Sequence, residues 1–346
     1  MSTLSPPSLD LLASWLSIDS TTGQEAAYLE ALEQTFRAAG LNVTRQPIAE
    51  GRWNIMASEA ERPRIIFNTH VDTVPPFFGP RWDGPLLRAR GACDTKGGLY
   101  TMWAAWCGLE PAERAEVGFS LVVGEEVDHI GAIEAAKEDW SGVDAIIMCE
   151  PTQNRLSRGQ KGILKLVLEA EGKAGHSAFL ESGFSANHAL IAVCNDLLEH
   201  TWPVDEGLGE TTLNIGVMGG GVAANVFAPS ARAELLFRVV SDLDALRAEV
   251  AGVIGGHVRA VEVAANDAIP LLWWEGFETD VVPFNTDAPY LCHHAPVVLV
   301  GPGDIRTAHC ADEHIHRDAI DEGVALYQRL VRGLLSGELR TDGSKA

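Results

Sequence analysis

The stretch Arg64-Ile-Ile-Phe-Asn-Thr-His70 is a short apolar run that leads to a histidine. A run of this length and composition predicts a buried strand over 64–68, ending just before His70. Two more buried strands are predicted, and each runs into acidic residues: 119–123 before Glu125-Glu126, and 145–149 before Glu150. A helix is predicted over 96–109. This alternation of apolar strands with helices indicates an α/β fold with a mostly parallel sheet.

The sequence also predicts helices near the N-terminus and a change of pattern after Glu150. The N-terminal helices cover 8–17 and 24–39, and Gly40 is placed to end the second. A further helix is predicted over 130–140. Beyond Glu150, strands pair around two helices, at 186–200 and 243–257. That order is typical of a separate, smaller α+β domain of roughly a hundred residues.

The α/β pattern then returns, with a strand at 296–301 and a final helix at 318–335. We therefore expect the second domain to be inserted into the first. The first domain, a mostly parallel mixed sheet flanked by helices, would comprise 1–160 and 272–346. The inserted α+β domain would comprise 161–271.

The composition argues against several classes of function. The chain has 346 residues, of which 46% are hydrophobic, and a formal net charge of -22 at pH 7. That charge repels nucleic-acid phosphate and anionic membrane surfaces. No apolar run is long enough to span a bilayer, and the N-terminus lacks the pattern of a signal peptide. The six cysteines form no CxxC pair, so we expect reduced thiols in a cytoplasmic protein.

Ionisable residues follow the ends of the predicted buried strands. They are His70, Glu125, Glu126, Glu150 and His309. Because the ligand crevice of an open α/β sheet lies at the carboxyl ends of its strands, these side chains should share one rim. Taken singly, each is more simply interpreted as a solvated polar residue. Together they have the composition of a site for two divalent ions with imidazole and carboxylate ligands.

The local spacings fit this interpretation. In His70-Val-Asp72, residues two apart on an extended chain share a face, so Asp72 can accept a hydrogen bond from the imidazole. Asp94 lies in the glycine-rich run 91–98, where a carboxylate can bridge two cations and glycine permits close backbone approach. In Glu125-Glu126, one carboxylate can bind metal while its neighbour is a general base for hydrolysis.

Five motifs, in this order along nearly the whole chain, resemble those of the M20 metallopeptidase and deacylase family. They are His70-Val-Asp72, Gly91 to Gly98 with Asp94-Thr-Lys-Gly-Gly, Glu125-Glu126, Glu150-Pro-Thr152 and Ala308-His-Cys-Ala-Asp-Glu313. The resemblance implies that Asp94 bridges two metal ions. His70 and Glu150 would hold one ion, and Glu126 and His309 the other. Zinc is the expected metal, with cobalt or manganese as alternatives.

The same resemblance implies roles for residues outside the ligand set. Glu125 would be the general base, and Asp72 would support the ligand His70. The inserted domain would be a lid that forms a homodimer, and its His176 would stabilise the oxyanion in a neighbouring subunit's active site. Asn225 and Arg238 resemble the lid residues that bind the substrate carboxylate. Without the resemblance, these three lid residues would be interpreted as surface side chains.

Within this family, the stretches 150–163, 285–290 and 300–309 resemble acetylornithine deacetylases. They imply hydrolysis of a small N-acyl amino acid such as N-acetylornithine, and an N-acetyl group is the expected acyl group. Asp287 could meet a cationic substrate side chain or equally cap the following helix. Acetylcitrulline, acetyllysine, carrier-linked amino acids, succinyl-diaminopimelate and dipeptides are alternative substrates, because all would share the metal ligands. A non-catalytic binding protein is a remote alternative, which the complete ligand set and Glu125-Glu126 disfavour.

Overall fold

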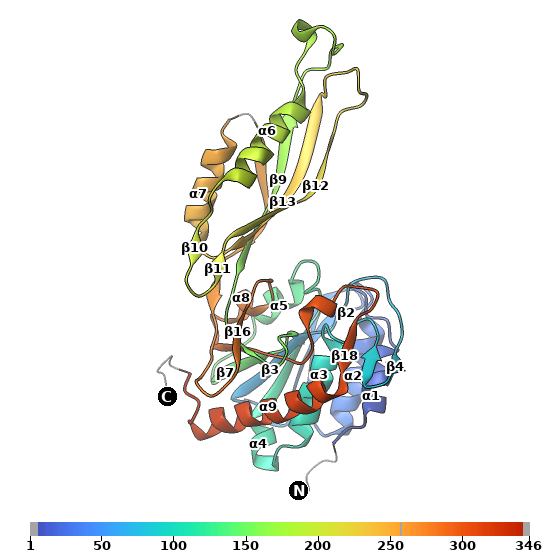
Figure 1. The fold of residues 1–346 in the computed structure, drawn as a ribbon. Coiled ribbons are helices and arrows are strands. Elements are labelled where there is room, and N and C mark those ends of the chain that lie inside the picture. The colour runs from blue at the N-terminus through green and yellow to red at the C-terminus, as the bar shows by residue number, and fades with distance from the viewer. Residues whose placement is uncertain (1–5, 257, 342–346) are drawn as a thin grey trace. The chain divides into compact units, whose positions relative to one another are not determined.

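The computed structural model describes residues 6–256 and 258–341, which form two compact units (Figure 1). Within those residues, the first unit contains the chain up to Arg158, Leu271–Asp280 and the chain from Thr286 onward. The second unit contains Gly159–Pro270 and Val281–Asn285. The second unit is therefore made from segments that lie inside the sequence of the first.

The first unit is built on a six-stranded mixed sheet. In spatial order its strands are β1 (Asn42–Ala49), β2 (Arg52–Ser58), β6 (Val117–Val122), β3 (Ile65–His70), β7 (Ala145–Met148) and β17 (Val297–Leu299). The last four are parallel neighbours, while β2 pairs antiparallel with both β1 and β6. Every residue of β3, β6 and β7 is buried, as expected for parallel strands covered on both faces. The predicted α/β fold with a mostly parallel sheet is confirmed.

Helices complete the first unit. They are α1 (Leu9–Leu16), α2 (Ala26–Ala38), α3 (Lys96–Cys107), α4 (Pro111–Ala115), α5 (Ile130–Ala135), α8 (Ala288–Leu291) and α9 (Arg317–Ser336). α3 is buried along its whole length, and α9 packs against it (Figure 1). The helix predicted over 130–140 is wrong in its second half. It ends at Ala135, where the indole N–H of Trp140 donates to the Ala135 carbonyl at 2.9 Å and the chain turns back.

The sequence does not predict several short strands. β4 (Arg81–Asp83), β5 (Leu86–Arg88) and β18 (His314–His316) form an antiparallel sheet in the order β18-β5-β4. A second small sheet has the order β15 (Ile269–Pro270), β8 (Leu156–Gln160) and β16 (Thr279–Val282). Strands of two to five residues have too few positions for an alternating pattern to be recognised.

The second unit is a four-stranded antiparallel sheet covered on one face by two helices. Its spatial order is β12 (Thr212–Gly220), β13 (Ser230–Val239), β9 (Gly162–Glu171) and β14 (Arg259–Asn266). The helices α6 (Ala186–Glu199) and α7 (Leu243–Ile254) share a core with alternate residues of β9 and β13. β14 is mostly exposed, which is why its apolar pattern does not reveal it. A short hairpin joins β10 (Val204–Asp205) to β11 (Gly209–Glu210).

All six cysteines are free thiols, and four of them are buried. Among the described residues, no helix has the combination of length and apolar character needed to cross a membrane.

Candidate metal centre

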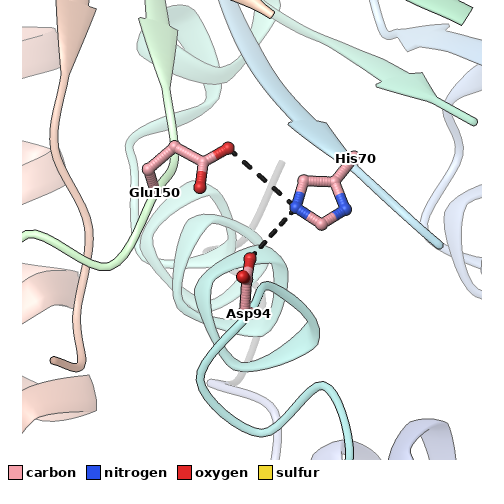
Figure 2. A group of neighbouring side chains, drawn as sticks. All are labelled: His70, Asp94 and Glu150. Atoms are coloured by element: carbon pink, nitrogen blue, oxygen red, sulfur yellow. Dashed lines mark hydrogen bonds and ion pairs between the residues drawn. The ribbon is translucent and has the colours of Figure 1, made fainter. Parts of the chain in front are cut away.

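A first group of potential metal ligands comes from three segments of the first unit (Figure 2). Nε2 of His70 lies 3.1 Å from Oδ1 of Asp94 and 3.9 Å from Oε1 of Glu150. All three side chains are nearly inaccessible to solvent. His70 is the last residue of β3, and Glu150 follows the neighbouring parallel strand β7. The strand therefore includes His70, which corrects the prediction that it ends earlier.

A second group shares Asp94 with the first. Nε2 of His309 lies 3.2 Å from Oδ2 of Asp94 and 3.0 Å from Oε2 of Glu126. Glu126 follows β6, which is the other parallel neighbour of β3. His309 lies in the loop after β17 and has a left-handed backbone, with φ of 59°. The two oxygens of Asp94 thus face different imidazoles, and the five predicted ligands lie together.

Both groups fit a divalent ion such as zinc in donor type and in spacing. Each offers one imidazole nitrogen and two carboxylates, and the ligand atoms in each lie within 4.8 Å of one another. Two donors at about 2.1 Å from a tetrahedral zinc ion are about 3.4 Å apart. The observed spacings of 3.0–3.9 Å surround that value. Three protein ligands per ion would leave a position for substrate or water, as in catalytic zinc sites.

The electrostatics of the cluster also favours cations. Burial raises the pKa of Glu150 well above its usual range, and the nearby carboxylate of Asp94 adds to the effect. Hydrogen bonding to carboxylates, Asp94 foremost, raises the pKa of His309 to about 10. Burial opposes the charged form of His70, but its contacts with Asp72 and Asp94 still raise its pKa well above normal. Negative charge is thus in excess here, and divalent ions would offset it.

Asp94 is held in place by a buried ion pair. Oε1 of Glu313 accepts hydrogen bonds from the backbone N–H groups of Cys93 and Asp94, both at 3.1 Å. The other oxygen of Glu313 pairs with Arg90, and neither side chain is more than 2% exposed. The sequence places Glu313 in a family motif, but no local pattern reveals that it fixes the Asp94 loop. That role depends on a contact between segments 219 residues apart.

Asp72 holds the loop that carries Glu125 and Glu126. Its Oδ1 accepts the backbone N–H groups of Gly124 at 2.9 Å and Glu125 at 3.1 Å. Its Oδ2 accepts the Glu126 N–H at 3.3 Å. The imidazole Nδ1 of His70 lies closer to the backbone oxygen of Asp72, at 3.0 Å, than to its carboxylate, at 3.6 Å. The expected bond from the imidazole is therefore made mainly to the Asp72 carbonyl.

Glycines allow α3 to begin beside the ligands. A Cβ atom on Gly98 would lie 2.2 Å from Sγ of Cys149, and one on Gly97 would lie 2.1 Å from the backbone oxygen of Ala92. Neither space admits a side chain, so the glycine run provides the close approach that its composition predicts. Because Cys149 precedes Glu150 and α3 follows Asp94, this packing helps to set the separation of two ligand-bearing segments.

Glu125 belongs to neither ligand group and faces two other residues instead. It forms a third cluster with His129 and Asp287. Asp287 is 2% exposed, and its Oδ1 lies 2.9 Å from Nδ1 of His129. It occupies the N-cap position of α8, but its side chain makes no capping hydrogen bond. The sequence does not single out His129, although its position four residues after Glu125 offered a signal.

The remaining predicted residues lie in the second unit. His176 and Asn225 are exposed and adjacent, because the N–H of Ser177 donates to the Asn225 carbonyl at 3.0 Å. Arg238 lies near the opposite end of β13, eight residues from Ser230, or roughly 25 Å along the strand. One chain therefore cannot bring Asn225 and Arg238 to the same small carboxylate. The expectation that both residues bind the substrate carboxylate stays a prediction, and it requires Asn225 from another copy.

Comparison with known proteins identifies the family. The sequence profile of peptidase family M20/M25/M40 matches residues 66–333. The chain belongs to this family. A peptidase M20 domain-containing protein of Schizosaccharomyces pombe is 32% identical over 337 residues, covering 93% of this chain and 84% of that protein. A probable carboxypeptidase of Aspergillus clavatus is 33% identical over 381 residues, covering 95% of this chain and 83% of that protein.

Solved structures of M20 proteins share the fold. A tripeptidase from Staphylococcus aureus aligns with a TM-score of 0.79 at 21% identity, covering 96% of this chain and all of that one. At that identity the likeness concerns the fold alone. As an M20 member, the chain is a metallopeptidase-family hydrolase with candidate ligands for two metal ions.

Glu313→Gln tests the buried support of Asp94. The glutamine amide would point an N–H at groups that are themselves donors, either the backbone N–H groups of Cys93 and Asp94 or the Arg90 guanidinium. It also removes the charge that balances Arg90, so we expect the unfolding free energy to fall by about 3 kcal/mol or more. Zinc affinity, measured by competition with a chelator, should fall on the order of 10- to 100-fold. Asp312→Asn is the matched control, because Asp312 is 73% exposed and should affect neither property. Wild-type stability and zinc affinity in Glu313→Gln would contradict this role.

Proposed function

We propose that this chain hydrolyses an amide bond whose amine product carries a free α-carboxylate, with two divalent ions held by the two ligand groups. The observation that carries the proposal is the shared carboxylate of Asp94, whose two oxygens face separate imidazoles. His70 and Glu150 complete one group, and Glu126 and His309 the other. Zinc is the proposed metal, with cobalt or manganese as alternatives.

Glu125 is the proposed general base, because its carboxylate is near enough to His70 and Glu150 to interact with their charges but belongs to neither ligand group. The bound ions would lower the pKa of the attacking water and polarise the amide carbonyl. Glu125 takes a proton from this water as the water oxygen attacks the carbonyl carbon. It then gives the proton to the amine nitrogen as the C–N bond breaks, which yields a carboxylic acid and a free amine. Burial raises the pKa of Glu125, which helps it to hold the proton between the two steps.

Arg238 is the proposed partner of the substrate carboxylate. In the described part of the chain, its guanidinium has no hydrogen bond or ion pair with another residue, although it is half-buried on β13. It points away from the face that α6 and α7 cover, because its neighbours Phe237 and Val239 fill that core. A planar guanidinium with no internal partner is suited to bind a carboxylate through two parallel hydrogen bonds.

We further propose that the protein is a homodimer formed through the second unit. His176 and Arg238 lie near opposite ends of the sheet, so a small substrate bound by Arg238 would need His176 from a second copy. The edge strand β12 supports this arrangement, because it exposes Val217 and Met218 beside an unpaired backbone. Exposed apolar edge strands are normally covered in the native assembly. His176, supplied by the partner, would stabilise the oxyanion.

Two substrate classes are compatible with this chemistry. The first is a small N-acyl amino acid, such as N-acetylornithine, which releases acetate and the free amine. Three stretches of the sequence favour it, including the segment around Asp287. The second is the C-terminal peptide bond of a short peptide, which the name of the Aspergillus relative favours. Both present the same carboxylate to Arg238, so they differ only in the group on the acyl side.

Glu125→Gln tests the general base. The variant keeps the shape of the side chain but cannot accept the proton, so kcat should fall at least on the order of 100-fold. Two equivalents of zinc should remain, measured by elemental analysis, because Glu125 is not a ligand. Glu134→Gln, on the surface of α5 where Glu134 pairs with Lys137, is the matched control and should leave kcat unchanged. Retained turnover in Glu125→Gln would remove Glu125 from the mechanism.

A substrate panel tests the proposed specificity. The zinc-loaded protein is incubated with acetylornithine, acetylcitrulline, acetyllysine, succinyl-diaminopimelate and short peptides, and with the same compounds capped as C-terminal amides. We expect kcat/KM to fall about 10- to 100-fold on capping, because a charged hydrogen bond to Arg238 is lost. Arg238→Gln should remove the difference between free and capped compounds. Equal rates for both forms in the wild-type protein would contradict recognition of the carboxylate.

A further inference from the structure

His129 occupies a constrained position in the loop between β6 and α5. Its backbone is left-handed, with φ of 55°, a conformation that is uncommon outside glycine, asparagine, aspartate and histidine. Its N–H donates to the Gly124 carbonyl at 2.8 Å, which closes the turn that carries Glu125 and Glu126. The imidazole is only 13% exposed. The backbone thus directs the side chain inward, toward Glu125.

Nδ1 of His129 lies between two carboxylates. It is 2.9 Å from Oδ1 of Asp287 and 3.8 Å from Oε1 of Glu125. The carboxylate of Asp287 is 3% exposed, and the ring of Tyr290 packs against the imidazole with 5.2 Å between centroids. The aspartate and the aromatic ring together fix the orientation of the imidazole. The Nδ1 proton is therefore held beside Glu125.

Glu125 has few other restraints on its carboxylate. Within residues 6–256 and 258–341, no group donates a hydrogen bond to its side-chain oxygens, and His129 is the one basic side chain within 4.0 Å of them. Asp72 holds the Glu125 backbone but does not reach its carboxylate. A glutamate has three side-chain torsions, so fixing the backbone leaves the position of its carboxylate open. His129 is therefore placed to restrict it.

We propose that His129, oriented by Asp287, is a positioning residue for the general base Glu125, an inference that rests on the proposed function. The Nδ1 proton is donated to Asp287 at 2.9 Å, and a small rotation of Glu125 brings its oxygen within hydrogen-bond distance of the same proton. Asp287 and Glu125 thus share one donor. This keeps the Glu125 carboxylate over the ligand groups while it receives a proton from one side and delivers it to the other.

In this arrangement Asp287 acts on His129 rather than through direct contact with a cationic substrate. Asp287 is only 2% exposed and its Oδ1 lies 2.9 Å from Nδ1 of His129, so its carboxylate faces the imidazole rather than open solvent. If Asp287 acts through His129, its removal lowers kcat for every substrate. If it bound a substrate cation, its removal would raise KM for cationic substrates and leave neutral ones unaffected.

The test compares His129→Gly with His129→Asn. Both residues tolerate the left-handed backbone, but only asparagine keeps an N–H donor at the δ position of the side chain, where Nδ1 lies. We expect His129→Gly to lower kcat on the order of 10- to 100-fold, with KM changed less than threefold and two zinc ions retained. His129→Asn should recover most of the loss. Val127→Gly, at a 71% exposed position in the same loop, controls for loosening of the backbone and should leave kcat within twofold.

The coupling to Asp287 is tested in the same assay. Asp287→Ala should resemble His129→Gly, and the double variant should be no slower than the slower single one, because both changes remove the same restraint. Wild-type kcat in His129→Gly, or loss of zinc from that variant, would overturn the inference. So would a His129→Asn variant no faster than His129→Gly, or a double variant in which the kcat losses of His129→Gly and Asp287→Ala multiply. Glu125→Gln is measured in parallel, so that the role of His129 and the role of Glu125 can be judged separately. If Glu125→Gln is inactive and His129→Gly is fully active, only the positioning role of His129 is overturned. If Glu125→Gln is active, the proposed general base is overturned.

Discussion

The constraint on which the site depends is the excess of buried negative charge at one end of the central sheet. Asp94, Glu126 and Glu150 form the two ligand groups there with only His70 and His309, and the further carboxylates of Glu125 and Asp287 lie in a third cluster. Two carboxylates about 4 Å apart repel by about 4 kcal/mol at an effective dielectric constant near 20. Divalent ions turn that repulsion into attraction. The fold therefore concentrates charge that is stabilising only when cations share the site.

Other carboxylates near the ligands have a different task, because they accept hydrogen bonds from the backbone. Asp72 binds three successive N–H groups from Gly124 to Glu126, and Glu313 binds those of Cys93 and Asp94. Each thereby fixes a loop whose side chains face the metal site. The strands set where these loops begin, and the buried carboxylates of Asp72 and Glu313 hold the backbone of each loop in its conformation. The geometry of the candidate ligand groups is thus set in part by residues outside those groups.

The sequence predicts the parallel sheet well, because strands buried on both faces appear as continuous apolar runs such as 64–68. Glu126 and Glu150 could be placed for the same reason, since each follows such a strand. His309 was also placed by its position after the strand predicted at 296–301, whereas the role of Asp94 as the bridging ligand came from the family resemblance. The contact between His129 and Asp287 could not be predicted, because the two residues are 158 positions apart in the sequence. The edge strand β14 could not be predicted, because it is mostly exposed and has no clear apolar pattern. The strands β4, β5 and β18 are too short for such a pattern to be recognised.

The most direct test of the central account is an anomalous-scattering map of zinc-loaded crystals, measured at the zinc absorption edge. A dinuclear centre predicts two peaks per chain, both next to Asp94. One peak should lie among His70, Asp94 and Glu150, and the other among Asp94, Glu126 and His309. A single peak, or peaks away from Asp94, would contradict the proposed dinuclear centre.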